Sequence, residues 1–89
     1  MNAIVTVVGQ DRVGIIAAIC IKLAGYNVNI LDISQTIIDG YFNMMMITDT
    51  AATSKKHAEM AADLKALGEE MGLVIRCQRE EIFTKMHRI

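Results

Sequence analysis

The residues most able to do chemistry gather in one stretch, GQDRVGI, at positions 9–15. A helical pattern of apolar residues follows it directly, and the first-turn amides of a helix attract anions such as a carboxylate. Gly14 would let a ligand approach the backbone closely, because it has no Cβ. Asp11 would hold an ammonium group through a charge-assisted hydrogen bond. An α-amino acid carries both groups, so this stretch is suited to bind one.

The same stretch also has an interpretation that needs no ligand. Asp11 would cap the helix, which stabilises a protein by about 1 kcal/mol. Gly9 and Gly14 would only form the turn. Arg12 would be solvated or paired with Asp32. Residue chemistry alone leaves both interpretations open.

The composition indicates one folded domain over residues 1–89. Hydrophobic residues make up 53% of the chain and charged residues 21%, which is typical of a globular protein. The formal net charge of −1 argues against nucleic-acid binding, which usually needs a basic face. Every apolar run is interrupted before it reaches the length of a membrane span, and the first residues lack the basic leader of a signal peptide. We therefore expect a cytoplasmic protein with no nucleic-acid or membrane partner.

No pattern in the sequence predicts a metal, a cofactor or a catalytic nucleophile. Cys20 and Cys77 lie far apart within apolar segments and lack CxxC spacing, so we expect two buried free thiols. A Ser-His-Asp or Cys-His arrangement is also absent. We therefore do not expect an enzyme.

Hydrophobic periodicity predicts six elements and a short C-terminal helix. Ser54 is the expected N-cap of the second helix, and Asp39-Gly40 predicts a tight hairpin turn. The expected elements are a strand at 2–8, a helix at 14–24, strands at 27–38 and 41–50, a helix that follows Ser54 and ends at Gly72, a strand at 73–79, and an amphipathic helix at 80–89. This order predicts an α+β, ferredoxin-like βαββαβ sandwich with a core over 2–80, in which two helices cover one face of a four-stranded antiparallel sheet.

The strand that follows the hairpin, YFNMMMI, is apolar on both faces. Phe42, Met44 and Met46 alternate with a second apolar set that begins at Tyr41. A sheet with helices on one side needs apolar residues on one face only. The second face must then be covered by the C-terminal helix, a partner subunit or both, and we expect a homodimer.

Three segments together resemble the ACT domain family. They are VVGQDRVGIIAAI, LAGYNVNILDISQ, and the Asp-Gly hairpin that leads into FNMMMI. The chain looks most like the small stand-alone ACT proteins, which are similar to the ACT portions of formyltetrahydrofolate deformylases and to glycine-cleavage repressors. The resemblance covers roughly residues 2–80 and agrees with the βαββαβ order.

The resemblance implies a regulatory module that dimerises and binds amino acids or similar small molecules between subunits. It assigns the ligand contacts to Asp11, to the backbone around Val13, Gly14 and Ile15, and to Asn29 at the start of the second strand. The family often has proline where this chain has Val13. Some amino-acid-sensing members carry a histidine near the start of the loop, where Gly9 and Gln10 stand here.

The leading hypothesis is therefore a non-enzymatic, homodimeric regulator that binds an amino acid or related metabolite. The alternative is a ligand-free protein-interaction regulator that acts through the Met-rich sheet face and the C-terminal helix. An acylphosphatase-like enzyme, with Arg12 holding phosphate and Asn43 placing water, would share the element order. That activity is improbable, because the long glycine-rich phosphate cradle is missing and Asp11 would repel the substrate.

Overall fold

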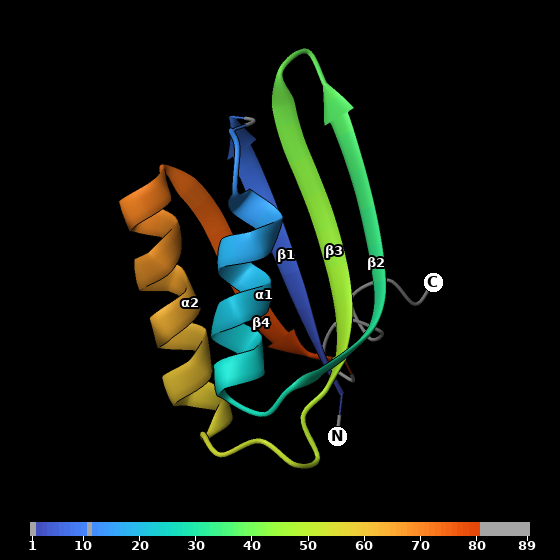
Figure 1. The fold of residues 1–89 in the computed structure, drawn as a ribbon, viewed down its shortest axis with the longest axis vertical. Coiled ribbons are helices and arrows are strands. Elements are labelled where there is room, and N and C mark those ends of the chain that lie inside the picture. Colours follow the sequence, from blue (N-terminus) through green and yellow to red (C-terminus); the bar gives the residue numbers. More distant parts are fainter. Residues whose placement is uncertain (1, 11, 81–89) are drawn as a thin grey trace.

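The fold is a four-stranded sheet and two helices, seen in a computed structural model that describes residues 2–10 and 12–80. The elements follow in the order β1 (Asn2–Gln10), α1 (Ile15–Gly25), β2 (Asn29–Ile38), β3 (Tyr41–Asp49), α2 (His57–Met71) and β4 (Leu73–Arg79). The sheet order is β2-β3-β1-β4, and each neighbouring pair is antiparallel. Both helices lie on the same side of the sheet (Figure 1). The predicted ferredoxin-like βαββαβ fold is thus confirmed.

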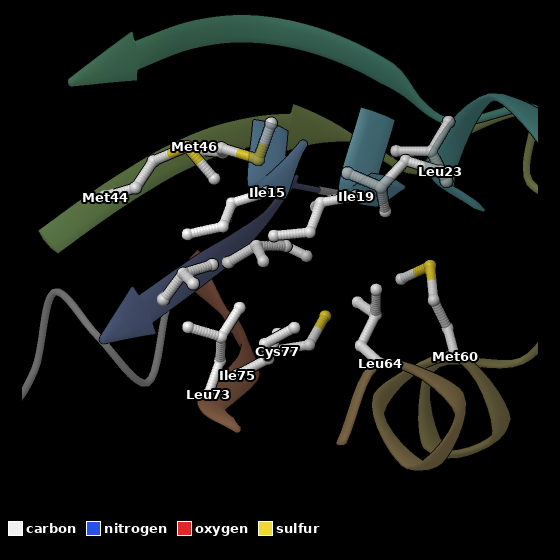
Figure 2. Packing of buried hydrophobic residues seen from close by; sticks show 14 of the residues in the cluster. Ile15, Ile19, Leu23, Met44, Met46, Met60, Leu64, Leu73, Ile75 and Cys77 are labelled. Carbon is white, nitrogen blue, oxygen red and sulfur yellow. The ribbon is translucent and has the colours of Figure 1, made fainter. Parts of the chain in front are cut away.

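The core fills the space between the helices and one face of the sheet. Figure 2 shows Ile15, Ile19 and Leu23 of α1 lying near Met44 and Met46 of β3. These α1 residues recur at helical spacing, which gives the helix one continuous apolar stripe. Leu73, Ile75 and Cys77 of β4 and Met60 and Leu64 of α2 complete the labelled set. Alternation along β3 and β4 therefore places every second side chain in the core, as the sequence predicted.

The second helix begins later than the sequence predicted. Ser54 is not its N-cap: α2 begins at His57 after Lys56, with no side-chain cap hydrogen bond. The N–H of Ser54 donates instead to the carbonyl of Tyr26 at 3.0 Å, and its Oγ lies 3.4 Å from the same oxygen. This shared acceptor holds Ser54 in the loop and prevents it from capping the helix.

One edge of the sheet is left uncovered. Strand β2 pairs only with β3 among the described strands. The turn of the β2–β3 hairpin extends beyond the N-terminal end of α1 (Figure 1). The alternating apolar residues of β2, Leu31, Ile33 and Ile37, are all exposed. They are exposed because β2 is an edge strand that neither helix covers.

The face of the sheet that points away from the helices is also apolar. Met45 and Tyr41 of β3 lie on this open face, with 37% and 52% of their surface exposed. Val8 and Val74, paired across β1 and β4, extend the same face. The prediction that β3 is apolar on both faces is correct. The helix was expected at 80–89, and all of this range except residue 80 lies outside the described residues.

The two cysteines are free thiols, as expected. Cys77 is buried in the core, and burial raises the pKa of its thiol to about 11. Cys20 on α1 is half-buried rather than fully buried. Within residues 2–10 and 12–80, neither helix is long and apolar enough to cross a membrane.

Candidate functional site

The loop between β1 and α1 ends in a backbone shape that suits glycine. Gly14 is the N-cap residue of α1 and has φ 90°, in the left-handed region that side chains disfavour. The first backbone hydrogen bond of the helix runs from the Ala18 N–H to the Gly14 carbonyl at 2.9 Å. No side chain among the described residues caps this end of α1. Its first-turn amides are therefore donors with no partner inside the helix.

A groove lies beside this first turn. It has a volume of about 320 Å³ and is bounded by the start of α1, strand β2 and the beginning of β3. Its lining residues are Arg12, Gly14, Ile15, Ile16, Ala17, Gln35, Ile37 and Phe42. The groove thus combines helix amides and a guanidinium with an apolar wall, which suits a small molecule that carries a carboxylate.

The sequence-predicted site residues fall in three different places. Gly14 and Ile15 line the groove, although the Ile15 side chain itself is buried. Val13 is 98% exposed and does not line it. Asp11 lies outside the described residues. Asn29 stands at the far end of β2, where it pairs with Asp49.

Asn29 and Gly14 are separated by the length of α1. The helix has 11 residues and is therefore about 16 Å long. Gly14 precedes its first residue, whereas Asn29 follows its last turn and the short loop after it. The structure of one chain does not bring these two predicted contacts to one ligand.

Six groove residues were missed by the assignment from sequence: Arg12, Ile16, Ala17, Gln35, Ile37 and Phe42. In the interpretation without a ligand, Arg12 was to be solvated or paired with Asp32; it is exposed, and its Nη1 donates to the Met71 carbonyl at 3.3 Å. Gln35 carried a usable signal, because it is the polar member of the row Ile33, Gln35, Ile37 on one side of β2. Ile37 and Phe42 are cross-strand partners, and only the pairing of β2 with β3 reveals that they share the groove.

The arrangement required for acylphosphatase-like chemistry does not form. Arg12 lines the groove on the helix side of the sheet. Asn43 instead lines a hollow with Ser34 and Met45 on the open face. These two side chains therefore lie on opposite sides of the sheet and do not share a pocket.

The other end of α1 is fastened to α2 by a polar network. The Tyr26 hydroxyl donates to Asp63 Oδ2 at 2.8 Å, and Lys55 Nζ donates to the same oxygen at 2.7 Å. Lys55 Nζ also lies 5.1 Å from the centre of the Tyr26 ring. Burial, assisted by the hydrogen bond to Asp63, raises the pKa of Tyr26 to about 12. The bond from Lys55, and then that from Tyr26, lowers the pKa of Asp63.

This network has a consequence for the groove. It fixes the segment that follows α1 against α2, while the first turn of α1 stays open beside β2. The helix is therefore anchored at the end away from the groove.

Comparisons with known proteins agree with this architecture. The model of the ACT domain family matches residues 2–78. The chain is 67% identical to a UPF0237 protein of Bifidobacterium longum, over 99% of this chain and 98% of that protein. It superposes on an ACT domain protein from Streptococcus pneumoniae with a TM-score of 0.82 and 37% identity, over 93% of each chain.

Two longer proteins share the fold. A formyltetrahydrofolate deformylase from Pseudomonas syringae pv. tomato matches with a TM-score of 0.79 and 22% identity, over 86% of this chain and 26% of that one. A structure named for a glycine cleavage system transcriptional repressor matches with a TM-score of 0.72 and 22% identity, over 88% of this chain and 44% of that one. At this identity the likeness concerns the fold alone. The family match and the similarity to the streptococcal protein together show that the chain belongs to the ACT domain family.

Proposed function

We propose that this protein is a non-enzymatic regulatory module that binds an amino acid or related small metabolite at a homodimer interface. The observation that carries the proposal is the groove beside the first turn of α1, which no side chain among the described residues caps. Membership of the ACT domain family supports it, because the sequence resemblance implies ligand contacts in this same loop. In this proposal the chain works as one domain in the cytoplasm, where the free thiols stay reduced.

The ligand carboxylate would lie against the amides that follow Gly14. A helix N-terminus attracts an anion through its free N–H groups and its dipole. The backbone around Val13 and Ile15 would complete this contact. Asp11 is the proposed partner of the ammonium group, since a carboxylate gives the stronger, charge-assisted kind of hydrogen bond.

A second copy of the chain would supply Asn29. Strand β2 is a ten-residue edge without Lys, Arg or Pro, the residues that usually protect an edge from pairing. Antiparallel pairing of two such edges places the start of one β2 beside the end of the other. Asn29 of the partner subunit would then lie near Gln35 and Ile37, which line the groove. The exposed apolar side chains of β2 would be buried by the same pairing.

The test is thermal unfolding against a panel of free amino acids. A ligand at about a hundred times its dissociation constant stabilises by roughly 2.7 kcal/mol, which raises the midpoint of a domain this size by on the order of 10 °C. The double variant Asp11→Ala, Asn29→Ala should lose this shift and keep its own midpoint. The matched control is Asp32→Ala with Asn43→Ala, the same two residue types on the open face, which should keep the shift. A shift that persists unchanged in the first double variant contradicts the site assignment.

The alternative is a ligand-free protein-interaction regulator. The specific observation in its favour is the open face, where Tyr41, Met45 and Val74 are exposed together. Methionine adapts well to irregular partner surfaces. This alternative replaces the first proposal if two results are found together. No amino acid changes the midpoint of thermal unfolding, and Met45→Glu abolishes binding to the protein that this chain regulates.

A further inference from the structure

The lining of the groove is of two chemical kinds. Gly14 offers backbone and Arg12 a guanidinium group, whereas Ile16, Ile37 and Phe42 offer apolar surface. Phe42 is buried in the core, but 56% of Ile37 is exposed. An exposed isoleucine beside a hollow offers apolar surface to a molecule that occupies it.

The charge and size of the groove narrow the class of occupant. Among the described lining residues, Arg12 is the sole charged side chain and Gln35 the sole amide. Arg12 would repel a cationic side chain, and a polar side chain packed against Ile37 and Phe42 would lose its hydrogen bonds to water without gaining partners from them. The volume of about 320 Å³ lies at the lower end of the range for small-ligand sites, which begins at about 300 Å³. It suits an amino acid rather than a nucleotide or a peptide.

We propose that the ligand is an α-amino acid with an apolar side chain, which packs against Ile37, Phe42 and Ile16. This inference rests on the proposed function and adds the class of ligand to it. The carboxylate lies beside Gly14, so the side chain of the ligand extends along the groove toward β2. Burial of that side chain is the source of the selectivity, because burial of apolar surface is favourable and needs no matched partner.

The test compares amino acids of equal shape and different polarity by calorimetric titration of the whole protein. Valine is compared with threonine, and leucine with asparagine. An apolar pocket discriminates such pairs by about 10- to 200-fold. We therefore expect valine and leucine to bind at least about tenfold more tightly than their polar counterparts, and lysine to bind most weakly.

Two neighbouring isoleucines provide a variant and its control. Ile37 pairs with Phe42 on the groove side of β2, whereas Ile38 pairs with Tyr41 on the open face. Their exposures are nearly equal, 56% and 60%. Ile37→Asn should reduce the preference for leucine over asparagine to less than about threefold, well below the discrimination of an apolar pocket. Ile38→Asn should leave that preference unchanged.

The outcomes separate this inference from the function on which it rests. If amino acids bind but threonine and asparagine bind as tightly as valine and leucine, the ligand class is wrong and the proposed function stands. If none of them binds, both fail. Light scattering on the same samples completes the test. If Ile37→Asn is monomeric while Ile38→Asn is dimeric, Ile37 serves the second copy, and its assignment to the ligand is overturned.

Discussion

The contact between α2 and β4 allows a quantitative prediction at Gly68. This glycine lies in the interior of α2, where helix propensity alone favours alanine by about 1 kcal/mol. A Cβ at this position would lie 2.7 Å from the Leu73 carbonyl oxygen and 3.0 Å from Ile75 Cγ1. The carbonyl belongs to the backbone of β4 and cannot move without displacing the strand. Overpacking of this kind costs about 1–3 kcal/mol. A contact this short with a backbone atom belongs in the upper part of that range, about 2–3 kcal/mol, so we expect Gly68→Ala to destabilise the protein by about 1–2 kcal/mol after the propensity gain.

Thermal unfolding followed by circular dichroism measures this effect. In a domain of this size, 1 kcal/mol changes the midpoint by about 4–8 °C, so Gly68→Ala should lower it by roughly 5–15 °C. Gly25→Ala is the control, because it ends α1 and a Cβ there meets no atom within 4 Å. It should raise stability by about 0.4–1 kcal/mol. All samples need equal protomer concentration, since dimerisation makes the midpoint depend on it. A higher midpoint for Gly68→Ala would refute the close packing of α2 on β4.

Three further predictions concern the ionisation of Asp63, the ionisation of Tyr26 and the reactivity of the two thiols. The lowered pKa of Asp63 means that its contribution to stability is present above its ordinary pKa and is lost as pH falls through its folded value. The free energy of unfolding should therefore be higher for the wild type than for Asp63→Asn at pH 7. This difference should vanish on acidification. A difference that does not change with pH would contradict the network. Tyr26, with its pKa raised from 10.0 to about 12, should act in the opposite direction, so its contribution is full below pH 10 and is lost as pH rises toward 12. Titration of the Tyr26 phenolate by its ultraviolet absorbance measures this pKa. Finally, a maleimide reagent at pH 8 should modify Cys20 much faster than Cys77, whose thiol is buried and whose pKa is raised to about 11; equal rates would show that the core opens readily.

The sequence predicted the fold because its local signals agree with one another. Asp39 and Gly40 both adopt positive φ, which is the reason that this pair forms the hairpin turn. Alternation along β3 separated its side chains into two sets, and the structure shows that Phe42, Met44 and Met46 enter the core. The predicted start of α2 was wrong because Ser54 can either cap the helix or lie in the loop before it. Which of the two it does depends on the carbonyl of Tyr26, far away in the sequence. A local capping rule contains no information on that contact.

Of the residues assigned from the sequence, only Gly14 and Ile15, next to the loop, line the groove. Gly14 was identified from its place before a helical pattern, and its left-handed backbone agrees with that choice. Gln35, Ile37 and Phe42 enter the groove through strand pairing, which joins segments that the loop motif does not include. Asn29 illustrates the reverse case. Its assignment came from a resemblance to proteins that bind ligands between subunits, and in a single chain it lies at the other end of α1.

The pairing of Ala3 with Arg79 has a consequence for how such a unit is joined to others. This pairing places the first and last described strands side by side at one end of the sheet. The groove lies at the other end, where Gly9 pairs with Phe42. The paired ends of the first and last described strands and the groove thus lie at opposite poles of the domain. A short linker at the first pole, to a second copy or to another domain, would not obstruct the second. A unit with this polarity can be transferred between longer chains by gene fusion with its groove left uncovered.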